Sequence, residues 1–168
     1  MVDQVGNMKI ALCGKMCSGK STLAKDYIEV SGGTIFSFSE PVYEIAQNLF
    51  GMVEKDRELL QKIGTKMREI DPDVWVNRLL RSVEECDENS GPVIVDDVRF
   101  VNEYEALREN GFKMVKCLVD EDLRMRNIDN LYGVEHAKYM SHVSETSLDH
   151  IPDEEYDAIY YNYGRRIY

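Results

Sequence analysis

The sequence predicts an α/β fold in which helices cover both faces of a parallel sheet, and two observations carry the prediction. Short apolar segments that suit buried strands alternate along the chain with segments of helical period. The segments between neighbouring strands are longer than about a dozen residues, which is the length that a parallel crossover needs. We therefore expect three layers, with the ligand site at the carboxyl ends of the strands.

Five apolar segments are the expected strands, and the first of them stops at Gly14, as a buried parallel strand would. The strands are expected at residues 8–13, 34–38, 92–96, 113–119 and 158–161. Apolar residues recur at helical spacing between them. The helices are expected within residues 19–30, 42–49, 60–70, 71–83 and 102–110.

One helix start and one irregular stretch are predicted in the regions between the strands. Asp71 and Pro72 are typical of an N-cap and the first residue of a helix. The residues of this helix that should point inward are Trp75, Leu79 and Val83. Residues 120–141 are polar, and we expect them to be irregular.

Size and composition indicate one globular domain over residues 1–168. The chain has no repeat, low-complexity tract or linker that would divide it. Hydrophobic residues make up 43% and charged residues 30%, an ordinary mix for a soluble domain. No segment approaches the ~18 consecutive apolar residues of a membrane-spanning helix, so we expect no membrane partner.

The charge of the chain argues against a nucleic-acid polymer as its partner. There are 31 acidic and 20 basic side chains, for a net charge of -11. A protein that binds a duplex or a membrane surface would need a basic face. A small anionic substrate remains compatible, provided that a few arginines gather around it locally.

The cysteines and the N-terminal residues indicate a cytoplasmic protein. The four cysteines have no disulfide-framework spacing, and two of them lie beside Gly14. Residues 1–7 are polar and lack the basic and apolar regions of a signal peptide.

One motif predicts a phosphate-binding loop. Residues Gly14 to Ser21 match G-x-x-x-x-G-K-[ST] in full, between a predicted strand and a predicted helix. The glycines let successive backbone N–H groups face a phosphate, and the helix N-terminus adds partial positive charge. Lys20 would reach the β- and γ-phosphates of ATP, and Ser21 would offer its hydroxyl to Mg²⁺. The residues expected to bind ATP are Gly14, Lys15, Met16, Cys17, Ser18, Gly19, Lys20, Ser21 and Thr22.

The third predicted strand ends in acidic residues beside this loop. Asp96 and Asp97 follow an apolar run, which is where a P-loop enzyme holds Mg²⁺ through water and receives its acceptor. Either aspartate could serve by position. Arg99 would point into the same crevice, and its planar guanidinium suits a phosphate dianion.

Four stretches resemble the deoxynucleoside monophosphate kinases of tailed bacteriophages, within the P-loop nucleoside monophosphate kinase group. They are the P-loop itself, residues 60–76, residues 97–103 and residues 142–145. The second and third stretches narrow the choice, because many enzymes share a P-loop. The four stretches span most of the chain in the order that this family has.

The resemblance implies an adenylate-kinase-like fold and an activity. A helical monophosphate-binding insert is expected at about residues 39–85, and a short lid at about 120–141. The implied reaction transfers phosphate from ATP to deoxynucleoside 5′-monophosphates, giving diphosphates, with Mg²⁺ as cofactor. The implied location is the cytoplasm of the phage's host. Small nucleotides are the expected partners, and a homodimer is left open.

The resemblance also implies roles for individual residues. Asp97 would act in catalysis at the metal and the acceptor, and Ser21 would share the metal. Arg99 and Arg68 would bind the acceptor phosphate, with Gln61 as a candidate base. The remaining implied roles are Arg124 and Arg126 as catalytic arginines of the lid and Asn162 against the adenine of ATP. At the end of the second predicted strand, Phe38 is a candidate contact for the acceptor's sugar or base.

Other functions stay open at this point. A P-loop kinase for another small acceptor, such as dephospho-coenzyme A or a sugar acid, would share most of these residues. A nucleotide-dependent switch is less favoured, since the chain has no N-K-x-D motif for reading guanine. His136, His142 and His150 do not match a zinc spacing. Ser144 and Glu145 could simply cap a helix.

Overall fold

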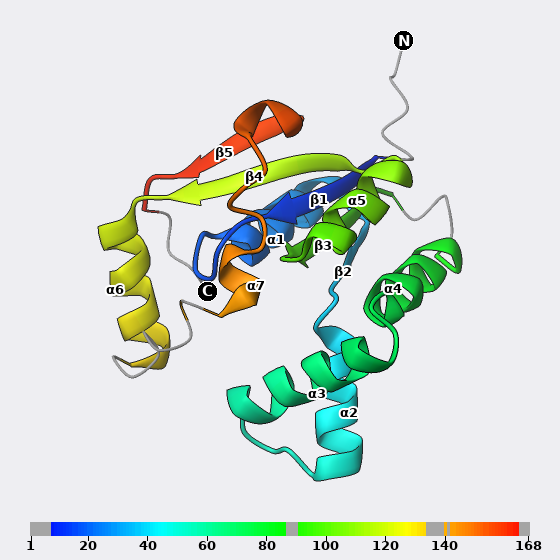
Figure 1. Cartoon of the computed structure of the whole chain (residues 1–168). Helices are drawn as coiled ribbons and strands as arrows, with labels where there is room; N and C mark the ends of the chain where they lie inside the picture. Colours follow the sequence, from blue (N-terminus) through cyan, green and yellow to red (C-terminus); the bar gives the residue numbers. More distant parts are fainter. Residues whose placement is uncertain (1–7, 87–90, 134–139, 141, 165–168) are drawn as a thin grey trace.

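The computed structural model describes residues 8–86, 91–133, 140 and 142–164. Its centre is a five-stranded parallel sheet in the order β2-β3-β1-β4-β5 (Figure 1). The strands are β1 (Lys9–Cys13), β2 (Thr34–Phe36), β3 (Val93–Val98), β4 (Lys113–Val119) and β5 (Ala158–Asn162). The five strands expected from the sequence are all present.

Helices cover both faces of this sheet. They are α1 (Lys20–Ser31), α2 (Glu40–Phe50), α3 (Arg57–Ile70), α4 (Val74–Glu84), α5 (Val101–Glu109), α6 (Glu121–Tyr132) and α7 (Val143–Thr146). On one face, Ala24 of α1 packs with Leu12 and Ile94. On the other, Leu107 of α5 packs in a core that includes Val95. The predicted three-layer α/β fold is therefore confirmed (Figure 1).

Three helices lie between β2 and β3 in the sequence and extend away from the sheet (Figure 1). They are α2, α3 and α4, and they cover the range expected for the acceptor insert. Trp75, Leu79 and Val83 of α4 are buried, as predicted. Helices α2 and α3 supply one wall of a cleft at the carboxyl ends of the strands.

The predicted start of α4 is wrong by two residues. The helix begins at Val74 after Asp73, and Asp71 instead follows the end of α3. Asp71 Oδ1 accepts a hydrogen bond from Asp73 N at 3.0 Å. The side chain of Asp71 therefore forms a turn between two helices, which the Asp-Pro pair alone does not distinguish from a cap.

The prediction that residues 120–141 are irregular is also wrong, because Glu121–Tyr132 forms α6. Asp120 is its N-cap and accepts a hydrogen bond from Leu123 N at 3.1 Å. Ile128 is completely buried on its inner face. Positions 134–139 and 141 of the expected lid, with His136, lie outside the described residues.

None of the helices within the described ranges is both long and apolar enough to cross a membrane.

Candidate active site

A cleft of about 450 Å³ lies at the carboxyl ends of β1, β2 and β3. Its walls come from the loop after β1, the loop after β2, and helices α3, α6 and α7. Most of the residues that the sequence analysis singled out line it. They include Met16, Cys17, Gly19, Lys20, Ser21, Phe38, Gln61, Arg68, Asp96, Asp97 and Arg99.

The loop between β1 and α1 adopts a backbone conformation that requires glycine at two positions. Gly14 has φ 145°, and a Cβ there would lie 2.5 Å from the carbonyl oxygen of Cys117. Gly19 has φ 95°, and a Cβ would lie 2.7 Å from Asn162 Nδ2. Neither position has room for a larger residue. The loop can therefore approach a phosphate with its backbone rather than with side chains.

Lys20 is buried at the base of this loop. Its Nζ donates hydrogen bonds to the carbonyl oxygens of Gly14 and Lys15, both at 2.7 Å. Burial lowers the pKa of Lys20 to about 8, and the nearby positive charge of Arg99 adds to this effect. An anion bound in the loop would stabilise the ammonium form, so the site favours a negatively charged ligand.

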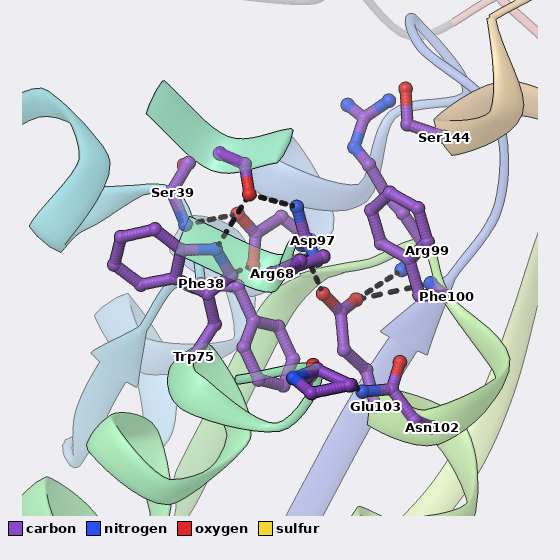
Figure 2. A network of polar contacts seen from close by, with 12 residues as sticks. Phe38, Ser39, Arg68, Trp75, Asp97, Arg99, Phe100, Asn102, Glu103 and Ser144 are labelled. Carbon is purple, nitrogen blue, oxygen red and sulfur yellow. Dashed lines mark hydrogen bonds and ion pairs between the residues drawn. The ribbon is translucent and has the colours of Figure 1, made fainter. Parts of the chain in front are cut away.

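The two aspartates of β3 face different partners. The pairing of β1 with β3 shifts register, so that Asp96 and Asp97 together oppose Leu12. Such a bulge re-aims side chains next to a site. Asp97 accepts hydrogen bonds from Ser37 Oγ at 2.6 Å, Phe38 N at 2.8 Å and Ser39 N at 3.0 Å (Figure 2).

Asp96 is the aspartate that turns toward the P-loop. Burial raises the pKa of Asp96, and the charge of Asp97 raises it further, while a hydrogen bond with Ser21 lowers it. Because Ser21 is the residue expected to bind Mg²⁺, these contacts favour Asp96 over Asp97 as its acidic partner. The role that the resemblance implies for Asp97 at the metal stays a prediction.

A buried glutamate links the side chain of Arg68 to the backbone of Arg99. Glu103 accepts hydrogen bonds from Arg99 N at 2.9 Å, Phe100 N at 3.1 Å and Arg68 Nη2 at 3.0 Å (Figure 2). The guanidinium of Arg68 stacks over the ring of Phe100, 4.0 Å from its centroid. Burial raises the pKa of Glu103 to about 7, against the lowering effect of these donors. Arg68 and Arg99 are thus brought to the same wall of the cleft.

The residues of α7 reach the P-loop from a distant part of the sequence. His142 is the N-cap of this short helix, and its Nδ1 accepts a hydrogen bond from Ser144 N. Glu145 Oε2 accepts a hydrogen bond from Met16 N at 2.7 Å, and Oε1 pairs with Arg99 Nη1. The stretch 142–145 therefore holds a carboxylate against the P-loop.

The two arginines of the expected lid differ in placement. Arg124 is buried, forms a bidentate pair with Glu121, and lines a second cavity of about 270 Å³ beside the P-loop. Its Nη1 atom is buried without a hydrogen-bond partner. Arg126 is exposed, donates to the backbone oxygen of Asp122, and lines neither cavity. The structure therefore brings Arg124, and not Arg126, to the site.

An orphaned donor beside the P-loop provides a test of whether ATP would fit. Arg124 Nη1 is buried without a partner, and Arg124 lines the same cavity as Gly14, Lys15 and Ser18. Phosphate oxygens would satisfy such a group. Within the described ranges, no group of three or more His, Cys, Asp or Glu residues could hold a metal. A Mg²⁺ ion here would be held by Ser21, by Asp96 through water, and by substrate phosphates.

Asn162, expected against the adenine, packs beneath the P-loop. It is buried, and its Nδ2 lies 3.5 Å from the carbonyl oxygen of Ser18. It lines neither of the two cavities. Its contact with Gly19 supports the loop, and a role at the adenine stays a prediction.

Sequence reasoning missed several residues of the cleft. Lys55, in the α2–α3 loop, lies 5.6 Å from the ring centroid of Tyr132 on α6, and Arg57, the first residue of α3, lies 4.3 Å from it. Lys55 also lies 5.5 Å from the ring centroid of Tyr43. These contacts join the two walls at the mouth of the cleft. No local pattern identifies them, because the partners are far apart in sequence.

The fold is shared with solved structures, although no protein-family model matches the chain and no curated protein matches it in sequence. One similar structure is TT1252 from Thermus thermophilus, with a TM-score of 0.59 and 14% identity. The match covers 94% of this chain and 90% of that one. Another is dephospho-CoA kinase from Campylobacter jejuni, with a TM-score of 0.53 and 14% identity over 95% of this chain and 90% of that one. The chain therefore has the α/β fold that this P-loop kinase also has.

Proposed function

We propose that the chain is a P-loop phosphotransferase that passes the γ-phosphate of ATP to the 5′-phosphate of a deoxynucleoside monophosphate. The donor side rests on the full motif from Gly14 to Ser21 and on the buried ammonium of Lys20. The choice of deoxyribose comes from the resemblance to phage kinases. The choice of a phosphate as acceptor has support from the cleft itself.

The main support for a phosphate acceptor is that the carboxylates lining the described part of the cleft already accept hydrogen bonds. They are Asp96, Asp97, Glu103 and Glu145, and each is already engaged with hydrogen-bond donors. A hydroxyl acceptor has to give up a proton, so it needs a free base. The oxygens of Asp97 and Glu103 are occupied by these donors, and Glu145 is paired with Arg99. Burial raises the pKa of Asp96, but its hydrogen bond with Ser21 would place it beside Mg²⁺ rather than beside the acceptor. A phosphate acceptor needs no base.

The arginines favour the same conclusion. Arg68 and Arg99 lie on one wall of the cleft, positioned by Glu103. A guanidinium can bind phosphate with two parallel hydrogen bonds. Two of them would offset the repulsion between the acceptor phosphate and the phosphates of ATP. Bound Mg²⁺ would add charge neutralisation on the donor side.

A panel of acceptors tests the proposal. ADP release would be measured with ATP and Mg²⁺ alone, and then with each deoxynucleoside and ribonucleoside monophosphate, dephospho-coenzyme A and shikimate. We expect at least one deoxynucleoside monophosphate to raise ADP release by ~10-fold or more, because water is a poorly positioned acceptor. Stimulation by dephospho-coenzyme A or shikimate alone would indicate a hydroxyl acceptor. Release that no acceptor changes would indicate a nucleotide switch.

Replacement of Arg99 by lysine should weaken acceptor binding by about 10- to 100-fold, since a bidentate contact becomes a point charge. The affinity for ATP should change much less. Calorimetric titration of the acceptor in the presence of saturating β,γ-imido-ATP and Mg²⁺, and of ATP alone, measures the two affinities. Arg108→Lys is the matched control, because Arg108 forms a half-exposed pair with Glu155 outside the cleft. An equal loss for ATP would place Arg99 on the donor side.

A further inference from the structure

Glu145 occupies the groups that a bound phosphate would use. Its carboxylate accepts a hydrogen bond from Met16 N, 129 positions away in sequence, at 2.7 Å. The other oxygen pairs with Arg99. The Glu145 side chain is only 5% exposed. A backbone N–H of the P-loop and an arginine of the acceptor wall thus meet on one buried carboxylate.

The charges around Glu145 are those that a phosphate needs. Its negative charge offsets part of the lowering of the Lys20 pKa, and it contributes to the raised pKa of Arg124. Burying a carboxylate is costly unless cations and donors surround it, as they do here. A phosphate group bound to the P-loop would meet the same surroundings. Two anions cannot share them without repulsion.

The two partners of Glu145 belong to different substrates in the proposed reaction. Met16 N lies in the loop that would bind ATP, whereas Arg99 would bind the acceptor phosphate. Glu145 therefore masks Arg99 while the P-loop is empty. ATP entering the loop would take over Met16 N and repel the carboxylate, which would release Arg99.

We propose that Glu145 is a phosphate surrogate whose displacement couples ATP binding to acceptor binding. This inference rests on the proposed function and adds cooperativity between the two substrates to it: bound ATP strengthens acceptor binding. The cavity of about 270 Å³ that Glu145 also lines contains Lys116 and Arg124, so the displaced carboxylate has space and cations nearby. Coupling of this kind is reciprocal, so the acceptor must also strengthen ATP binding.

Calorimetry on the full chain tests the coupling. The affinity of each of the four deoxynucleoside monophosphates would be measured with and without saturating β,γ-imido-ATP and Mg²⁺. In the wild type, we expect the ATP analogue to raise acceptor affinity by about 10-fold, within the usual range of coupling between sites. In Glu145→Gln, which keeps an oxygen for Met16 N but loses the charge, acceptor affinity without the analogue should rise by a similar factor. The coupling should then fall to about 1.

Controls separate this inference from the proposed function. Glu155→Gln removes a carboxylate that pairs with an arginine on the surface, and it should keep the coupling of the wild type. A wild type that binds neither nucleotide would refute the proposed function. Binding of both without coupling, or coupling that survives in Glu145→Gln, would overturn the inference alone.

If Glu145 only holds the structure in place, the measured affinities should follow a different pattern. Glu145→Gln would then weaken both nucleotides and leave the ratio of affinities unchanged, which also overturns the inference. Thermal unfolding checks that the variant folds. If it does not, Glu145→Asp serves, because the carboxylate is one methylene shorter and cannot reach Met16 N and Arg99 together. The same loss of coupling is expected there.

Discussion

Replacing Lys20 with alanine is expected to lower kcat/KM by at least ~10²-fold while the fold is retained. Lys20 is buried, and its ammonium group is held by the carbonyl oxygens of Gly14 and Lys15 at the base of the P-loop. A charge fixed before the reaction, in a site with little water, stabilises the phosphoryl group in the transition state by several kcal/mol. Alanine removes that charge and leaves the backbone intact.

The pH dependence of the same enzyme gives a second measurement. The pKa of Lys20 is lowered to about 8 in the free protein. The ammonium group is therefore lost as the pH rises through about 8, and kcat/KM should decline above that value. In Lys20→Ala this decline should disappear.

Lys25→Ala is the matched control for Lys20→Ala, because Lys25 lies exposed on the same helix, α1. It should keep the activity and the pH profile of the wild type. Turnover close to wild type in a folded Lys20→Ala protein would show that the P-loop does not act as proposed. Circular dichroism and thermal unfolding would establish that the variant is folded.

The fold could be predicted from the sequence because its determinants are local. The apolar run of a strand and the helical spacing of apolar residues each lie within one short segment, so each segment carries its own pattern. The P-loop was located for the same reason, since Gly14, Gly19 and Lys20 act within one short loop. Helical spacing alone predicts Trp75 and Leu79 in the core, and both are buried.

The missed features depend on contacts between distant segments or on weak local patterns. The contact of Glu145 with Met16 joins residues 129 positions apart, so no spacing indicates it. Helix α6 did carry a local pattern: Asp120 at the N-cap, acidic residues in the first turn, and Gly133 after the last turn. Its low content of apolar residues concealed it. Only Ile128 among its apolar side chains is fully buried.

The sequence alone does not decide whether Asp96 or Asp97 faces the P-loop. Adjacent residues of a strand point to opposite faces, and a one-residue shift exchanges them. The register between β1 and β3 shifts at this point, so counting along the sequence does not settle which aspartate faces the P-loop. The resemblance to phage kinases implied Asp97. The contacts of the two carboxylates favour Asp96 for the metal.

Asp96→Asn is therefore expected to lower kcat by ~10²-fold or more at limiting Mg²⁺, since removal of one charged group in a phosphoryl-transfer site costs several kcal/mol. Asp96 is hydrogen-bonded with Ser21, the expected ligand of Mg²⁺, and its pKa is raised by burial and by the charge of Asp97. An amide in its place keeps the shape but loses the attraction for the ion. The variant should also need more Mg²⁺ to reach half of its maximal rate.

Asp97→Asn should behave differently, because Asp97 holds the turn between β2 and α2. Its carboxylate accepts three hydrogen bonds, from Ser37 Oγ, Phe38 N and Ser39 N. An amide offers one oxygen in place of two, so the variant should lose about 1–3 kcal/mol of stability. It should bind the acceptor less well, since Phe38 and Ser39 line the cleft there, and it should keep the Mg²⁺ dependence of the wild type. Rates across a Mg²⁺ titration and thermal unfolding distinguish the two variants. If Asp97→Asn alone shifts the Mg²⁺ requirement in a stable protein, the metal belongs to Asp97, and Asp96 serves only to hold Ser21.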